Sequence, residues 1–154
     1  MLQILHDGIH ANLDIDTTNF TGDVETDSQL AYVLGLVGGR LVAVDSSGKV
    51  QLADGADAND LRAIGFVIND AAGYFFMNKP AIASLKVPVV FGNAVVITDQ
   101  IDPAITFAPG EKLYCGTTGK LGLITNVAAA GAALVGYAGS AASAASPELL
   151  IYVK

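Results

Sequence analysis

The sequence has few of the residues on which catalysis, disulfide bonding and metal binding depend. Among 154 residues there is one cysteine, no tryptophan and two histidines, His6 and His10. A single cysteine excludes an intramolecular disulfide and any zinc site that needs several cysteines. Because no histidine follows His10, a Ser-His-Asp site would have to recruit the N-terminal segment. We therefore expect a protein that is not an enzyme and needs no cofactor or metal ion.

Charge is also scarce and is mostly negative. Charged residues make up 15% of the chain, against about 25% in average soluble domains. A net charge of −7 argues against nucleic-acid binding, which needs clustered lysine and arginine. The hydrophobic fraction is 52%, yet no apolar run is long enough to span a membrane, and the start MLQILHDGIH lacks the basic stretch of a secretory signal. This much apolar surface indicates burial against other protein chains.

The net charge is concentrated at the N-terminus. The first 39 residues contain six acids and no lysine or arginine. Residues 1–26 show no sustained helical or strand period, which is typical of an extended arm. Residues 27–37 fit a short helix and a strand equally well. We expect an acidic arm at 1–38 and a single β domain at 39–154.

Two stretches of the chain echo each other at a constant offset of 71 residues. Residues 39–52 read GRLVAVDSSGKVQL, and residues 110–123 read GEKLYCGTTGKLGL. The offset also pairs Ile64-Gly65-Phe66 with Val135-Gly136-Tyr137. Because the match fades between residues 74 and 107, we predict two equivalent hairpins in one β domain, framing a unique central hairpin.

Short strands follow from the alternation of apolar residues and from the turn residues between them. Pro88 cannot donate to a ladder, so its strand is predicted at an edge or a bulge. Gly92-Asn93 is a two-residue hairpin signal. The predicted strands are Leu41–Val44, Lys49–Leu52, Ala63–Ile68, Tyr74–Met77, Leu85–Phe91, Ala94–Thr98, Leu113–Cys115, Leu121–Ile124, Ala133–Ala138 and Leu149–Val153. This spacing predicts a mainly β fold, a small barrel or sandwich.

The N-terminal histidines and acids make weak metal sites. His6 and His10 stand four apart, but Gly8 lies between them and no helical pattern surrounds them. Asp14 and Asp16 miss the spacing of a calcium-binding loop. We expect these side chains to be solvated or in contact with a partner.

The remaining candidate groups have structural explanations. Asp99, Asp102 and Glu111 fall in predicted loops, and we expect them on a solvated surface. Cys115 corresponds to Val44 in the echo, so it is expected as a small buried apolar residue.

Residues 39–154 resemble the head decoration, or cement, proteins of tailed bacteriophages. The resemblance rests on the order of phrases: LVAVDSSGKVQLADGADANDLRAIGFV, then LKVPVVFGNAVVIT, then PGEKLY, then LVGYAGSAASAASPELLIYV. It implies a β-barrel or tulip-like domain on the outer capsid surface of the virion, often trimeric, made in the host bacterial cytoplasm. An N-terminal segment would help to grip the major capsid protein.

We therefore expect a structural virion protein that clamps neighbouring capsid subunits, with copies of itself as further partners and a trimer ahead of a dimer. The alternative is a receptor- or carbohydrate-binding β module of a phage fibre or tail. Lys49 and Lys120, at equivalent turn exits, are candidates for contact with an acidic neighbour, such as the arm of another copy. The candidate contacts with the capsid or between subunits are Leu2, Ile4, Leu5, Leu13, Ile15, Phe20, Lys49 and Lys120.

Overall fold

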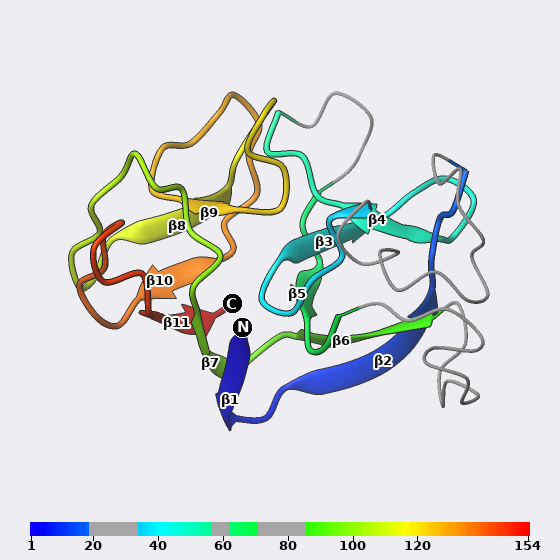
Figure 1. Ribbon diagram of the computed structural model, residues 1–154, viewed down its shortest axis with the longest axis horizontal. Helices are drawn as coiled ribbons and strands as arrows, with labels where there is room; N and C mark the ends of the chain where they lie inside the picture. The colour runs from blue at the N-terminus through cyan, green and yellow to red at the C-terminus, as the bar shows by residue number, and fades with distance from the viewer. Residues whose placement is uncertain (19–33, 57–61, 71–85) are drawn as a thin grey trace.

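The computed structural model describes residues 1–18, 34–56, 62–70 and 86–154, and the regular secondary structure of these residues is almost all β. Strands assemble into two antiparallel sheets, six-stranded and five-stranded, on the left and right of Figure 1. The strands are β1 (Leu2–His6), β2 (Ile9–Asp14), β3 (Leu41–Val44), β4 (Val50–Leu52), β5 (Gly65–Val67), β6 (Lys86–Phe91), β7 (Val95–Thr98), β8 (Lys112–Cys115), β9 (Ile124–Thr125), β10 (Gly136–Ala138) and β11 (Leu149–Val153). The predicted mainly β fold is confirmed, and it is a sandwich-like arrangement rather than a closed barrel.

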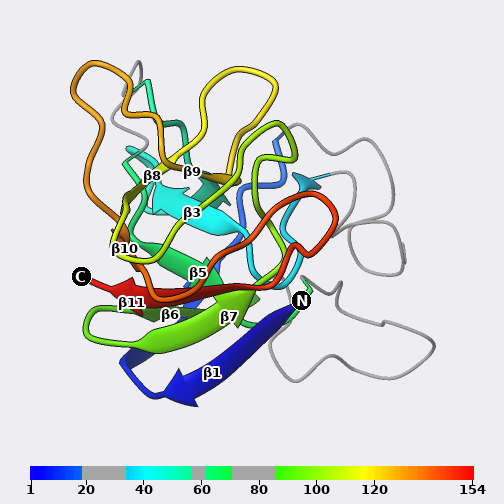
Figure 2. The ribbon, with the colours of Figure 1, turned by 90° about the vertical axis from the view of Figure 1, so that its left-hand side faces the viewer.

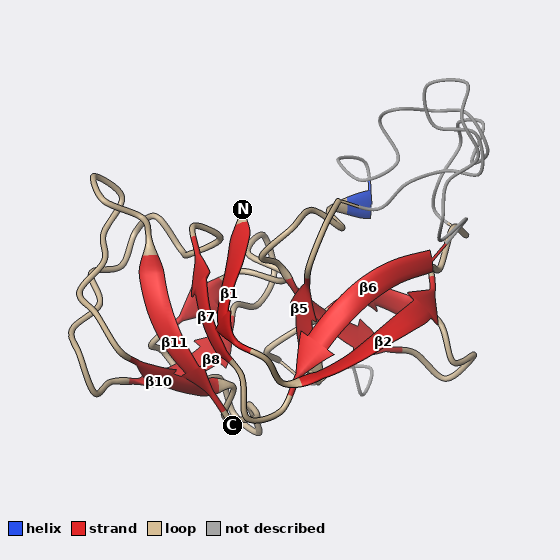
Figure 3. Cartoon of the chain, turned by 90° about the horizontal axis from the view of Figure 1, so that it is seen from below, coloured by secondary structure: helices blue, strands red, loops and turns tan. Residues whose placement is uncertain are grey.

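The order of strands in each sheet reveals the internal repeat. The six-stranded sheet runs β1-β7-β11-β10-β8-β9, and the five-stranded sheet runs β2-β6-β5-β3-β4. Each hairpin of the echo therefore lies in a different sheet, followed by its own glycine-bearing strand (β5 or β10) and a closing strand (β6 or β11). Figures 2 and 3 show the same two groups of strands from other directions.

The repeat holds at the level of single hydrogen bonds. Strand β3 pairs β5 in the register Val42↔Gly65, and β8 pairs β10 in the register Leu113↔Gly136, which is the same register 71 residues later. The amide of Ile64 donates to the carbonyl of Val42 at 2.8 Å. At the matching position Val135 donates to Leu113, also at 2.8 Å. The β6 hairpin, which the sequence presented as unique, thus has a positional counterpart in β11.

The glycines of β5 and β10 are explained by close backbone approach. A Cβ on Gly65 would lie 2.4 Å from the carbonyl oxygen of Val90, and one on Gly136 would lie 2.2 Å from that of Tyr152. These distances are far inside van der Waals contact, so each closing strand can approach only a residue without a side chain.

The second hairpin departs from the first in its return strand. Sequence matching predicted a strand at Leu121–Ile124, but β9 covers Ile124–Thr125. The reason is an extra turn, in which Leu123 N donates to Lys120 O at 3.1 Å and Gly122 has φ +70. The backbone of Gly122 bonds to the first hairpin, donating to Ala53 and accepting from Leu41. Because of these two bonds, the backbone of Gly122 does not pair with β8.

The N-terminal segment expected as a separate arm is hydrogen-bonded into both sheets. Strand β1 pairs β7 at the edge of the six-stranded sheet, and β2 pairs β6 at the edge of the five-stranded sheet. Short apolar clusters in residues 2–15 gave no readable period, because each strand faces the core with only a few residues. Of the segment 27–37, residues 27–33 lie outside the described part, as does the predicted strand at 74–77, and Leu34–Val37 contains no strand.

The predicted edge position of Pro88 is wrong, because β6 is an interior strand. It lies between β2 and β5, with Pro88 opposite Asn12 of β2. The carbonyl of Pro88 accepts from Ile68 N at 2.8 Å, just past the end of β5. Nitrogen and carbonyl of one strand residue point to the same side. The position at which Pro88 lacks an N–H therefore lies beyond the last residue of β5. No hydrogen bond between β5 and β6 is lost.

One core joins the two sheets. Leu41, Phe66 and Val90 of the five-stranded sheet are buried in the same cluster as Leu113 and Ile151 of the six-stranded sheet. A second cluster on the other face of the five-stranded sheet contains the following residues: Ile15, Leu36, Val42, Val50, Val67, Val87 and Val89. Since both faces of the five-stranded sheet are buried, its strands read as nearly continuous apolar runs.

Candidate partner-binding surfaces

The most exposed aliphatic side chains of the N-terminal strands lie where β1 turns into β2. This corner is at the bottom of Figure 1, between the edges of the two sheets. Leu5 is 52% exposed and Ile9 is 61% exposed. Beside them His10 Nε2 lies 3.2 Å from Asp7 Oδ1. We call Leu5, Ile9 and the outer edges of β1 and β2 the corner surface.

The structure divides the predicted arm contacts into core and surface residues. Leu2 and Ile4 are half-buried against the shared core, and Leu13 packs against the second cluster. Ile15 is 3% exposed and forms a parallel bridge with Val50. Only Leu5 among them is exposed. Phe20 lies outside the described residues.

Alternation along β1 explains this division. Successive side chains of a strand point to opposite sides, so Leu2 and Ile4 face the core and Gln3 does not. The same alternation places Leu5 on the outer side, and a bulge between Ile4 and His6 brings His6, opposite Val95, to that side as well. Sequence reasoning missed Ile9, although an apolar residue directly after the turn residue Gly8 would have marked the start of a second strand.

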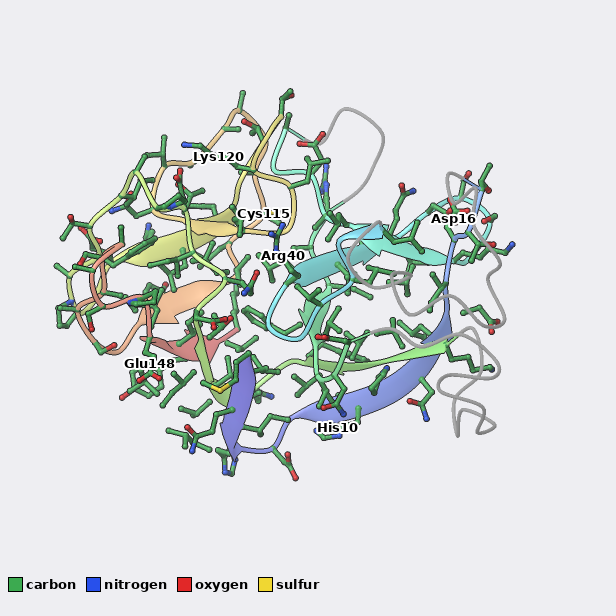
Figure 4. All side chains as sticks on the ribbon, viewed as in Figure 1. His10, Asp16, Arg40, Cys115, Lys120 and Glu148 are labelled. Carbon is green, nitrogen blue, oxygen red and sulfur yellow. The ribbon has the colours of Figure 1, made fainter. Side chains whose placement is uncertain are left out.

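The two candidate lysines lie in different surroundings. Lys49 is exposed at the β3–β4 turn. The Nζ of Lys120 lies 2.6 Å from Oδ2 of Asp102. Both residues line a shallow depression together with Thr117 and Thr125. Lys120 is labelled in Figure 4, beside the loops of the six-stranded sheet. Lys120 already has an acidic partner within its own chain, whereas Lys49 has no acid within ion-pair distance in the described residues.

Asp102 is buried, which corrects the expectation that it lies on a solvated loop. Only 2% of the residue is exposed. Burial raises its pKa, but the hydrogen bonds from Lys120 and from Ala104 N and the attraction of Lys120 outweigh this, so the pKa is lowered. Both carboxylate oxygens accept a hydrogen bond, which identifies a structural role for the charge.

Cys115 lies in the shared core, 3% exposed, as its match with Val44 predicted. Its thiol donates to the carbonyl of Ala53 at 3.2 Å. Burial raises the pKa of this thiol to about 11. A thiol held protonated is a poor nucleophile and a poor metal ligand.

Other charged groups are held by hydrogen bonds within the chain. Glu111 accepts from Asn126 Nδ2 at 2.9 Å and from Ala108 N at 3.0 Å. These bonds lower its pKa. Arg40 connects the halves of the molecule, because it donates to Gln100 and to the carbonyl of Leu121.

In the described ranges, no three or more His, Cys, Asp or Glu side chains are grouped closely enough to hold a metal ion. The described residues also contain no helix with the length and apolarity to cross a bilayer. Comparison of the chain with protein-family models, with curated proteins and with solved structures finds no match.

Proposed function

We propose that this chain is a structural virion protein that decorates an icosahedral phage capsid and stabilises it by clamping neighbouring major capsid subunits. The phrase order shared with head decoration proteins motivates the proposal. The observation that carries it is the corner surface, where two aliphatic side chains at 52% and 61% exposure stand beside two sheet edges.

The corner surface offers both kinds of contact that strand addition uses. A sheet edge presents unpaired backbone donors and acceptors to an extended segment of a partner. Apolar side chains at the same place add burial energy, about 1.5–3 kcal/mol for each large aliphatic residue that becomes fully buried. Leu5 and Ile9 supply those side chains, and the outer edges of β1 and β2 supply the backbone groups.

Co-sedimentation with mature capsids of the encoding phage tests the proposal. We expect the wild-type chain to bind and to raise the melting temperature of the capsid. Leu5→Lys and Ile9→Lys should weaken binding at least about tenfold, since each places a charge in an apolar contact. Val127→Lys, at a side chain that is 65% exposed elsewhere on the molecule, is the matched control.

Two results would sink the proposal: no binding to capsids, or capsids lacking the chain that are equally stable to heat. The alternative, a receptor- or carbohydrate-binding module of a fibre or tail, would gain support from a reproducible hit on a glycan array. Self-association, with the trimer ahead of the dimer, stays a prediction of the resemblance.

A further inference from the structure

The outer face of the six-stranded sheet carries exposed tyrosines beside aliphatic residues. Tyr137 and Tyr152 are directly opposite each other on β10 and β11, and they are 42% and 51% exposed. Residues opposite each other in an antiparallel pair lie on the same face of the sheet. The pairing register therefore identifies the other side chains of this outer face. The outer face comprises Gln3, His6, Val95, Ile97, Lys112, Tyr114, Thr125, Tyr137, Leu150 and Tyr152.

The internal repeat shows what covers the corresponding face of the sister sheet. Tyr137 corresponds to Phe66, and the pairing Tyr137↔Tyr152 corresponds to Phe66↔Val90. Phe66 and Val90 are fully buried in the core shared with the six-stranded sheet. The side of the five-stranded sheet that carries Phe66 and Val90 is thus interior. The equivalent side of the six-stranded sheet, which carries Tyr137 and Tyr152, is an outer surface.

Charge along β11 is arranged so that a second copy fits it. Every second residue along β11 and its two flanking positions lies on this side: Glu148, Leu150, Tyr152 and Lys154. This row has an acid at one end and a base at the other. The amide of Lys154 donates to Val135 O, which continues the β10–β11 register past the end of the strand. Glu148 is labelled in Figure 4, at the lower left.

A twofold axis between the two outer faces, perpendicular to β11 and level with the middle of that strand, would place each group opposite its complement. Glu148 of one copy would face Lys154 of the other, and Leu150 would face Tyr152. Isologous contacts of this kind require a self-complementary patch. In the described residues neither Glu148 nor Lys154 has an ion-pair partner within the chain.

The outer face is an exposed patch of a few hundred Å². The six strands lie about 4.8 Å apart and are two to five residues long, at roughly 3.4 Å for each residue, so the face is on the order of 24 Å wide and at most about 17 Å long. Exposed apolar patches of several hundred Å² mark interaction sites.

We propose that the outer face of the six-stranded sheet binds the same face of a second copy of this chain, with β11 antiparallel to its counterpart. This contact gives dimers, and in that respect it departs from the trimer that the resemblance implies. It does not depend on capsid binding.

Sedimentation velocity over a range of concentrations tests the contact in the full chain. The wild type should shift from the monomer of 15.7 kDa to twice that mass as concentration rises. Tyr152→Lys should weaken the dimer at least about tenfold, as expected for an aromatic residue at the centre of an interface. Val127→Lys adds the same charge at an exposed position off the face and should leave dimerisation unchanged.

A charge exchange tests the twofold geometry specifically. Glu148→Lys and Lys154→Glu each oppose like charges across the axis, so each should weaken the dimer several-fold at low salt. The double variant Glu148→Lys/Lys154→Glu restores opposite charges and should recover the wild-type dimer. Circular dichroism of each variant checks that the fold is retained.

The proposal is overturned by a chain that stays monomeric at about 100 μM, by a dimer insensitive to Tyr152→Lys, or by a double exchange that does not recover. If the chain is monomeric and Tyr152→Lys abolishes capsid binding, the face belongs to the capsid and not to a second copy. A normal dimer without capsid binding would contradict the proposed function and leave this inference standing.

Discussion

The ammonium group of Lys120 lies 2.6 Å from the carboxylate of Asp102, a residue that is only 2% exposed. Lys120 stands in the second hairpin turn, and Asp102 follows β7. The pair therefore fixes that turn against the segment between β7 and β8. Lys49, the counterpart of Lys120 in the repeat, is exposed and has no acid at this distance in the described part of the chain.

Replacing Lys120 by methionine should destabilise the protein, because the buried carboxylate of Asp102 loses its charged partner. We expect a loss of about 1–3 kcal/mol in the free energy of unfolding, the usual cost of an unsatisfied buried polar group. Urea unfolding at pH 7 measures this. Lys49→Met is the matched control and should change stability by less than about 0.5 kcal/mol; equal losses in the two variants would contradict the role of the pair.

Acid should remove the contribution of Asp102. Its folded-state pKa is below that of the unfolded chain, so the ionised group stabilises the fold above the unfolded pKa of about 3.9. This stability is lost as the pH falls through the folded pKa. Asp102→Asn should be less stable than wild type at pH 7, and the difference should shrink as the pH falls below about 4. A difference that stays constant from pH 7 to pH 3 would exclude the titration.

Cys115 should be unreactive in the native protein. Its thiol is buried and its pKa is raised to about 11, so little thiolate exists at pH 8. A colorimetric thiol reagent should react slowly with the folded chain and quickly once the chain is unfolded in guanidinium. Rapid reaction of the native protein, at the rate of a free cysteine, would show that this part of the core opens readily.

Gly136→Ala should be strongly destabilising, because the new Cβ would collide with the backbone of β11. The loss should be about 1–3 kcal/mol or more, as for other overpacked positions. Gly65→Ala should behave alike, since the repeat places it in the same contact with β6. Gly119, at φ +80 with open space around it, provides the control. Gly119→Asn should lose little, because asparagine tolerates positive φ.

Removal of residues 1–8, which contain β1, should cost far more than loss of a solvated arm. The deletion exposes the edge of β7 and uncovers core residues that Leu2 and Ile4 cover. We expect a lower melting temperature and aggregation through the open edge. Thermal unfolding of the variants Ile4→Ala and Leu5→Ala distinguishes the core contact of Ile4 from the exposed position of Leu5. Ile4→Ala should cost about 2–3 kcal/mol as a half-buried core residue and Leu5→Ala much less; the reverse order would place Leu5 in the core.

Local physical chemistry in the sequence was sufficient for the fold class and for most elements of residues 39–154. Strand Leu41–Val44 was predicted with its observed bounds, because a short apolar run followed by a glycine turn carries its own signal. The positive φ of Gly48 and Gly119 follows from the same turn chemistry. The burial of Cys115 followed from its match with Val44.

Only the tertiary structure decided where these elements lie relative to one another. Asp102 reads as a loop residue, but packing buries it beside Lys120. Leu121 to Leu123 match the first return strand, yet the backbone of Gly122 bonds to Leu41 of β3 and to Ala53, just past β4, instead of to β8. Pro88 is inside a sheet because β2, from the far end of the chain, pairs with its strand. Partners distant in sequence leave no local pattern, since their hydrogen bonds and apolar contacts arise only once the chain has folded.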